Sequence, residues 1–355
     1  MSNVSCYTGL SLILPELLLV PLRESLKRRR KGAAPALNRP AVQTYVSHLD
    51  LETKDFCSEL LNYGKAGSTA VDPMPMIQRL SLSLALTLNW GVRMSSQEDR
   101  LFAEITYVED EVSRFRSTTG NLQDYIPLLR LSPFNLGSAK ARQIRNRLDV
   151  YLKYLNDGLD ERIRNGTHKP CIQANVILDE ENKLNAEELV SISLTMLSGS
   201  LDTITTLVAW SIALLAQRPD IQQKAWEEIK EFYRDDEPLC DALDDQKCQY
   251  IVALVRECLR YYTVLRLALP RTSIKDITYN GVVIPKGAVV FLNAWACNMG
   301  NVFLSSTVPI HRSHRELTPI SQDESVWESP EEFRPERWLE QPGISYVCWF
   351  TSRQS

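Results

Sequence analysis

The chain has 355 residues, of which 44% are apolar and 24% charged, the balance of a globular protein and not of a disordered one. This length suits one large domain or two ordinary ones. The formal net charge of −4 gives general nucleic-acid binding no electrostatic support, so nucleic acid is not an expected partner. Eight cysteines without a Cys-x-x-Cys pair indicate reduced thiols and not a disulfide framework.

An apolar stretch at residues 10–20 is the candidate for a membrane anchor. Pro15 and Glu16 interrupt it, and it is shorter than the roughly 20 residues that span a bilayer. The basic run at residues 27–31 follows this stretch, unlike a secretory signal, where it would precede it. The sequence therefore predicts no anchor and a cytoplasmic location for the chain as written. The basic run is interpreted as a solvated helix face, with docking to a membrane surface or a partner as the alternative.

The first part of the chain is predicted to be mostly helical. Amphipathic helices are expected at residues 51–63, 98–116 and 142–164, the last ending at the helix-stopping pair Asn165-Gly166. Breaks are expected at Gly32, Pro40, Gly64, Pro73 and Gly120.

A long apolar helix is predicted for residues 185–218. Asn185 can cap the free amides of its first turn while Glu188 reaches back, a capping box. Pro219 ends this helix and opens the next one, which continues to about Tyr233. Because the long helix is apolar nearly all round, we expect it to cross the middle of a large domain.

A further helix is expected at residues 244–263, and after it the periodicity changes. Apolar residues alternate loosely around Asn280-Gly281, a hairpin signal, and another short strand is expected at residues 288–292. The predicted fold class is therefore mainly α with a small β-sheet.

Residues 199–203, Gly-Ser-Leu-Asp-Thr, place a carboxylate beside a hydroxyl inside the long helix. Asp202 and Thr203 are candidate catalytic residues, because a carboxylate beside a hydroxyl can relay protons. The alternative for Thr203 is a purely structural bond back to a carbonyl one turn earlier.

Glu257 and Arg260 share one face of their helix at i, i+3, and Arg337 can complete a buried Glu–Arg–Arg cluster. A buried group of this kind must be fully paired, because a lone buried charge costs several kcal/mol. The same spacing recurs in pairs that are expected at the surface: Glu111/Arg114, Glu161/Arg164 and Glu331/Arg334.

Three segments, taken in chain order, resemble the signature of the haem-thiolate monooxygenases, the cytochrome P-450 family. They are residues 199–203, the pair Glu257/Arg260 and residues 333–338, Phe-Arg-Pro-Glu-Arg-Trp. Residues 256–271 and 293–299 resemble its fungal phenylacetate hydroxylases more closely. The resemblance implies a P-450-like helical fold, a haem cofactor, oxygen as co-substrate and electrons from a flavoprotein reductase. It also implies hydroxylation of phenylacetate or a hydroxyphenylacetate.

The resemblance further assigns roles to single residues. Arg271 is expected to reach a haem propionate, with an ordinary surface arginine as the alternative. Arg266 is expected, from its location, to pair with the carboxylate of the substrate. Ser200 stands where the family usually has glycine, which is expected to narrow the oxygen groove. The family is associated with the endoplasmic-reticulum membrane.

The cysteine loop of the family, Phe-x-x-Gly-x-Arg-x-Cys-x-Gly, does not follow Trp338 in this sequence. Cys348 is the only cysteine after Arg337, and its surroundings lack the glycine and arginine of that loop. We therefore expect the chain as written to be truncated before its haem ligand and inactive. The alternative is a haem-free, non-catalytic helical remnant or binding fragment of a monooxygenase.

The predicted domain is an incomplete P-450 domain at residues 23–342, flanked by atypical segments at 1–22 and 343–355. Residues 300–322 have no clear period and are expected to be an insertion that, like the tail, is translated intron sequence. His311 and His314 lie within them, but no third ligand accompanies them and no metal site is predicted.

Overall fold

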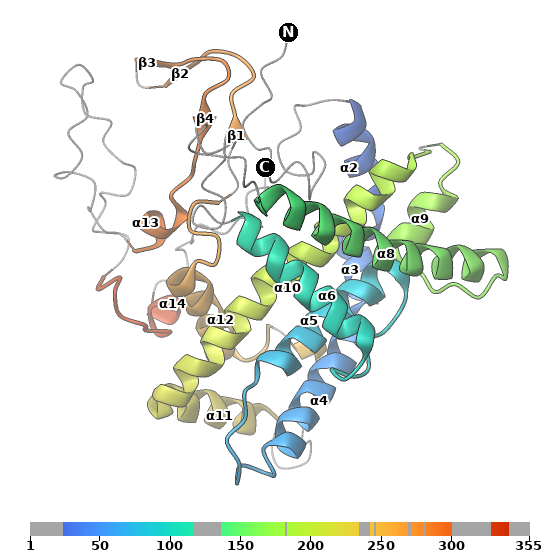
Figure 1. Ribbon diagram of the computed structural model, residues 1–355. Coiled ribbons are helices and arrows are strands. Elements are labelled where there is room, and N and C mark those ends of the chain that lie inside the picture. Colours follow the sequence, from blue (N-terminus) through green and yellow to red (C-terminus); the bar gives the residue numbers. More distant parts are fainter. Residues whose placement is uncertain are drawn as a thin grey trace. The chain divides into compact units, whose positions relative to one another are not determined.

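The computed structural model describes residues 24–116, 136–181, 183–233, 242–244, 246–268, 271–279, 281–299 and 328–340. The expectations for residues 1–22, Gly120, 300–322 and 343–355 lie outside these ranges. The chain divides into two compact units, residues 1–205 and 206–355. Figure 1 shows the described elements as coloured ribbons.

The first unit is entirely helical in its described part. Its elements are α2 (Glu24–Leu37), α3 (Arg39–Thr44), α4 (Val46–Tyr63), α5 (Met74–Trp90), α6 (Arg100–Arg116), α8 (Leu136–Arg164), α9 (Ile172–Leu178) and the first part of α10 (Ala186–Gln217).

The three amphipathic helices predicted for this unit are confirmed as α4, α6 and α8, although α4 and α8 begin five or six residues earlier than expected. The break predicted at Gly32 is wrong, because α2 continues through it. A Cβ atom added at Gly32 would lie 3.5 Å from Leu184 and Val176, which is ordinary van der Waals contact, so the helix does not require glycine there. Gly91 does end a helix: with φ of 68° it closes α5 as a left-handed cap.

The start of α10 is the capping box that the sequence predicts. The amide of Glu188 donates to Asn185 Oδ1 at 2.9 Å, and the amide of Asn185 donates to Glu188 Oε2 at 3.1 Å. Arg28 of α2 reaches the other oxygen of Glu188 at 2.6 Å. Part of the basic run is thus engaged with this helix terminus, where a carboxylate is itself favoured by the helix dipole.

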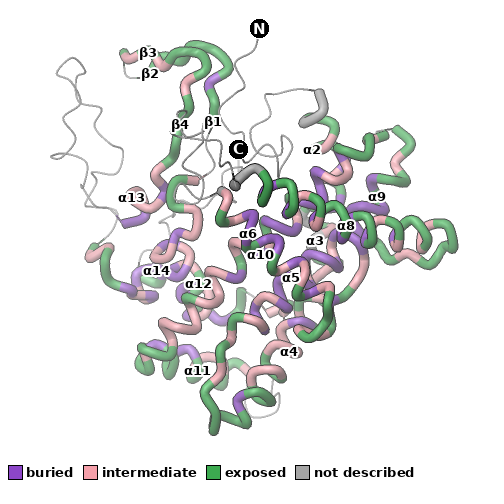
Figure 2. The backbone as a smooth tube through the Cα atoms, viewed as in Figure 1, coloured by how far each residue is buried: buried purple, intermediate pink, exposed green. Residues whose placement is uncertain are grey.

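The first part of α10 lies in the core of the first unit (Figure 2). Leu194 and Leu197 are buried together with Trp90, Ile105 and Leu148 of the neighbouring helices. The prediction of a central helix is therefore right for this part.

The same prediction is wrong for the second part of α10. None of residues 206–217 is buried, and Trp210 is 56% exposed, with its ring stacked on Tyr262 at 5.7 Å. Among the described helices, α10 alone is long and apolar enough to cross a membrane. Its length and its apolar composition are the only evidence for a membrane-spanning role. The core helix of a soluble protein can have the same length and composition.

The second unit combines helices with two small antiparallel sheets. Its helices are α11 (Pro219–Tyr233), the 3-10 turn η3 (Ala242–Asp244), α12 (Gln249–Tyr262), α13 (Ala294–Met299) and α14 (Arg337–Glu340). One sheet pairs β1 (Arg271–Thr272) with β4 (Val289–Val290), and the other pairs β2 (Ile277–Tyr279) with β3 (Val282–Ile284). The predicted hairpin is confirmed, since Gly281 joins β2 to β3 with φ of 77°.

The helix predicted from residue 244 begins later, at Gln249. Asp244 instead ends a 3-10 turn and accepts a hydrogen bond from the Tyr233 hydroxyl at 2.8 Å. The free amides at the start of α12 are satisfied by Glu228 of α11, which accepts from Tyr250 at 2.8 Å and Ile251 at 3.2 Å. This cap comes from another helix, so local sequence could not locate it.

The capping box of α10 gives a first test. Asn185→Ala should lower the free energy of unfolding by about 1 kcal/mol, because it leaves an amide of the first turn without its acceptor. The exposed Asn62, whose side chain makes a long hydrogen bond of 3.4 Å to Ser58, provides the control. Asn62→Ala should stay within about 0.5 kcal/mol of the parent in urea unfolding. Equal effects of the two substitutions would contradict the cap.

Candidate functional site

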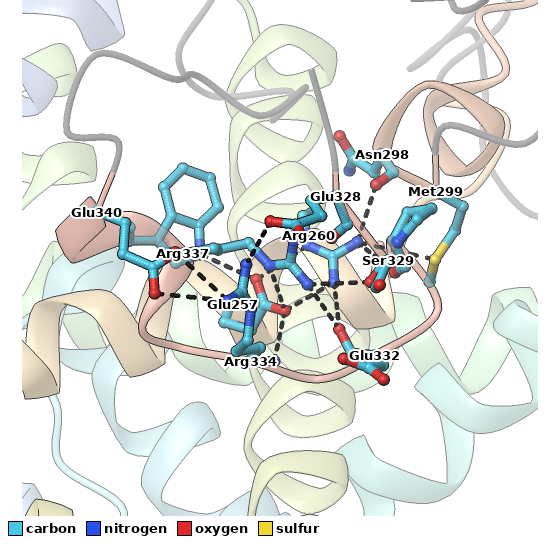
Figure 3. A network of polar contacts seen from close by, with 12 residues as sticks. Glu257, Arg260, Asn298, Met299, Glu328, Ser329, Glu332, Arg334, Arg337 and Glu340 are labelled. Atoms are coloured by element: carbon cyan, nitrogen blue, oxygen red, sulfur yellow. Dashed lines mark hydrogen bonds and ion pairs between the residues drawn. The ribbon is translucent and has the colours of Figure 1, made fainter. Parts of the chain in front are cut away.

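The carboxylate of Glu257 is the centre of a buried polar cluster in the second unit (Figure 3). Glu257 and Arg260 are fully buried, and Arg337 is 4% exposed. Glu257 Oε1 lies 2.7 Å from Arg260 Nη2 and 3.1 Å from Arg337 Nε. The structure thus brings together the three residues that the sequence analysis groups, from α12 and from the start of α14.

Two further donors complete the shell of Glu257. The backbone amide of Arg334 donates to Oε1, and the indole Nε1 of Trp338 donates to Oε2, both at 2.9 Å. With two bonds from Arg260 and one from Arg337, the carboxylate accepts five hydrogen bonds. A buried carboxylate needs this many donors because it has lost all of its water.

Arg260 uses all five of its N–H groups. Nε and Nη2 hold the two oxygens of Glu257, while Nη1 donates to the carbonyls of Asn298 at 2.9 Å and Pro330 at 2.8 Å. The second N–H of Nη2 reaches the carbonyl of Glu332 at 3.1 Å. A single guanidinium therefore joins α12 to α13 and to residues 328–333.

Arg337 fixes the same segment from its other side. Its Nη1 donates to the carbonyl of Glu328 at 2.6 Å, and its Nη2 donates to those of Ser329 at 3.1 Å and Glu332 at 2.9 Å. Phe333 anchors the segment by apolar packing, edge-on to Tyr261 at 5.5 Å. Residues 328–338 are thus held by charge-assisted bonds and by the buried rings of Phe333 and Trp338.

Burial and hydrogen bonding act in opposite directions on Glu257. Burial alone would raise its pKa, but the bonds and charge of Arg260, helped by the Arg334 amide, hold the pKa below its ordinary value. For Arg337, burial lowers the pKa of the guanidinium, against the attraction of Glu257. A guanidinium nevertheless stays charged at neutral pH.

Sequence reasoning missed several members of this cluster. The Trp338 indole could have been found, because a buried tryptophan needs an acceptor for its N–H. The backbone groups of Arg334, Asn298 and Pro330 carry no sequence signal. The expected Glu331/Arg334 pair is not formed: Arg334 is 3.4 Å from Glu328 and 3.3 Å from Glu340.

Asp202 and Thr203 stand on α10 in the first unit, each half-buried. Thr203 Oγ1 donates to the carbonyl of Gly199 at 2.5 Å, the bond expected of a structural threonine. Its oxygen keeps lone pairs that can accept a further hydrogen bond. A side chain at Gly199 would meet nothing within 4 Å, so the helix surface beside Thr203 is open.

Ser200 is held by α5. Its hydroxyl donates to the carbonyl of Ser81 at 2.8 Å, and the Ser81 hydroxyl lies 2.9 Å from the carbonyl of Ser200. This reciprocal pair sets how α10 is rotated against α5. The expectation that Ser200 narrows an oxygen groove stays a prediction.

Arg266 and Arg271 both lie exposed after α12. Arg266 stands over the ring of Trp295, with its Cζ 5.8 Å from the ring centroid, and forms no ion pair with any acidic group among the described residues. Arg271 begins β1 opposite Val290. Its expected contact with a haem propionate stays a prediction.

Five cysteines lie among the described residues: Cys57, Cys171, Cys248, Cys258 and Cys297. Desolvation raises the pKa of the thiols of Cys57, Cys171, Cys258 and Cys297. Cys248 is buried at the start of α12. Cys348 lies outside the described residues.

The fold and the Glu257 cluster define a mainly helical protein of the P-450 type, and comparison with known proteins agrees. The sequence matches the family model for cytochrome P-450 over residues 13–304, so the chain belongs to this family, whose cofactor is haem.

Individual relatives are also similar over most of the chain. Identity is 68% over 322 residues with 3-hydroxyphenylacetate 6-hydroxylase of Emericella nidulans, covering 91% of this chain and 58% of the relative. It is 42% with phenylacetate 2-hydroxylase of the same fungus, covering 90% and 57%. It is 37% with a cytochrome P-450 monooxygenase of Mycosarcoma maydis, covering 89% and 54%. The chain thus spans little more than half the length of these relatives.

The Glu257 cluster gives a second prediction. Glu257→Ala should lower the free energy of unfolding by about 3–5 kcal/mol, because it leaves two buried guanidinium groups without their carboxylate. The control is Glu161→Ala, an exposed glutamate with the same spacing to an arginine, which should cost less than about 0.5 kcal/mol.

The effect should depend on pH. Because the folded pKa of Glu257 is lowered, its stabilisation is fully present above the unfolded pKa, near 4.5, and is lost as pH falls through the folded value. The stability difference between the parent and Glu257→Gln should therefore shrink at pH well below 4.5. A difference that stays constant with pH would show that the ionised carboxylate is not what holds the cluster.

Proposed function

We propose that the whole protein is a haem-dependent monooxygenase that hydroxylates a small aromatic acid, such as a hydroxyphenylacetate or phenylacetate. The observation that carries this proposal is the 68% identity over 322 residues with a 3-hydroxyphenylacetate 6-hydroxylase. The 42% identity with a phenylacetate 2-hydroxylase supports the same class of substrate. Both relatives are named for acting on a benzene ring that carries a short carboxylate side chain.

Arg266 is the residue proposed to bind the carboxylate of the substrate. Its guanidinium is exposed and forms no ion pair with an acidic residue in the described part of the chain. A planar guanidinium can bind a carboxylate through two parallel N–H···O bonds, which fixes orientation as well as position. Binding the acid in this way would leave the ring as the part of the substrate that is presented for reaction.

Asp202 and Thr203 are proposed to handle protons. Bound haem would supply the oxygen activation of the family, with oxygen and a flavoprotein reductase as the other reactants. The chain's own contribution is a hydroxyl already oriented by the Gly199 carbonyl, with a carboxylate on the adjacent residue. Arg271 is the proposed partner of a haem propionate, since its side chain is exposed at the start of β1.

A haem-free, non-catalytic role is the second candidate. In this role none of the chain's cysteines would bind iron. The reduced, carbon-monoxide-bound absorption spectrum separates the two candidates. A red-shifted thiolate band supports the monooxygenase, and its absence from the product of the complete gene would support the haem-free role.

The activity is tested on the product of the complete gene, expressed with a flavoprotein reductase and fed 3-hydroxyphenylacetate under oxygen-18. The expected result is a dihydroxylated acid that carries one labelled oxygen atom. Arg266→Gln, which removes the charge at similar size, should raise KM for the acid at least tenfold and leave the spectrum unchanged. Absence of labelled product in the presence of a thiolate band would contradict the proposed substrate class.

The proton role of Thr203 has its own test. Thr203→Ala should bind substrate normally but form several-fold less product per reductant consumed, with the missing electrons recovered as hydrogen peroxide. Thr203→Ser is the matched control, because it keeps the hydroxyl and should keep the coupling. If Thr203→Ala were as tightly coupled as the parent, this threonine would serve only to bond Gly199 within the helix.

A further inference from the structure

The loop that carries Arg266 is held in a strained conformation. It is bounded by Thr263 with φ of 39° and Ala268 with φ of 48°, both in the left-handed region that residues other than glycine rarely adopt. Such strain persists only where the surrounding contacts fix it, and it is commonest at binding sites. The contacts that fix this loop therefore bear on what Arg266 does.

Helix α13 provides those contacts. The amide of Trp295 donates to the carbonyl of Arg266 at 3.1 Å, in the middle of the loop. At the start of the loop, Nδ2 of the fully buried Asn298 donates to Thr263 Oγ1 at 2.9 Å. That hydroxyl in turn donates to the carbonyl of Arg260 at 2.6 Å. Both ends of α13 are thus bonded to the chain that leads to Arg266.

Helix α13 is itself held at both ends. Asn293 Oδ1 accepts the amide of Ala296 at 3.0 Å and so caps its first turn. At its other end, the carbonyl of Asn298 accepts from Arg260 Nη1 at 2.9 Å. A series of direct bonds therefore connects the Glu257 cluster, through Arg260 and Asn298, to the loop.

The indole of Trp295 contacts the side chain of Arg266 as well as its backbone. With Cζ of Arg266 5.8 Å from the ring centroid, the guanidinium lies within the range of a cation–π interaction. An arginine that rests on an aromatic ring keeps its N–H groups for a carboxylate, and its long side chain loses the freedom to swing into solvent.

We propose that Trp295 is the specificity-determining positioning residue of the carboxylate site, and that Asn298 positions the same loop from its other end. Trp295 holds the Arg266 guanidinium where an arylacetate places its charge, so that the site selects acids over uncharged molecules of the same shape. This inference rests on the proposed role of Arg266 as the carboxylate anchor. It adds that selectivity depends on a residue that itself carries no charge.

The test is calorimetric titration of the product of the complete gene with phenylacetate and with phenylacetamide, which has a similar shape and no charge. The parent should bind the acid more tightly than the amide. Trp295→Leu should reduce this preference roughly fivefold or more by weakening the acid alone, while Trp295→Phe, which keeps a ring, should retain most of it. Asn298→Ala should reduce the preference in the same direction, and circular dichroism identifies any variant that does not fold.

The variant Arg266→Gln distinguishes the role of Trp295 from the proposed role of Arg266 as the carboxylate anchor. In that background, adding Trp295→Leu should change the acid preference no further, because the two residues act on one charge. If Arg266→Gln abolishes the preference and Trp295→Leu lowers acid and amide binding equally, the role of Trp295 is overturned and Arg266 remains the anchor. If Arg266→Gln binds the acid as well as the parent, or if the parent binds neither compound, both proposals are overturned.

Discussion

The organisation of the second unit depends on one fully buried carboxylate. Glu257 accepts five hydrogen bonds, and the donors come from α12, from the strip around residues 328–338 and from α14. Two guanidinium groups face a single carboxylate, and their remaining positive charge is met by backbone carbonyls. Buried charges are tolerated only when all of their partners are present. Removal of any one member therefore leaves the others buried without a partner, which costs several kcal/mol of stability.

This constraint extends from structure to the proposed chemistry. Arg260 bonds both Glu257 and the carbonyl of Asn298, and Asn298 bonds the first residue of the Arg266 loop. The cluster is therefore bonded, through Arg260 and Asn298, to the loop that carries the proposed substrate-binding arginine. The chain belongs to the cytochrome P-450 family and is similar to two fungal arylacetate hydroxylases, which is the basis of the carboxylate-binding role proposed for Arg266.

Much of this could be predicted from local sequence, for identifiable physical reasons. The capping box of α10 depends on residues three apart, and Pro219 and Gly281 act on their own backbone, so each was located correctly. The contacts of Glu257 with Arg260 and Arg337 were anticipated because ordered motifs place them together. By contrast, the start of α12 depends on Glu228 of another helix, and the second half of α10 is apolar without being buried. Neither property can be derived from the periodicity of apolar residues. Periodicity shows which face of a helix is able to be buried, but not which other element covers that face.

The central claim is that the Glu257 carboxylate holds α13 and the Arg266 loop in place. Hydrogen–deuterium exchange of the full chain, comparing the parent with Glu257→Gln, tests it most directly. The account predicts faster exchange at the amides of residues 263–268, 294–299 and 332–340, with the α5, α6 and α8 amides of the first unit unchanged. If residues 263–268 and 294–299 stayed as protected as in the parent while residues 332–340 opened, the loop would be held independently of the cluster and the account would be wrong.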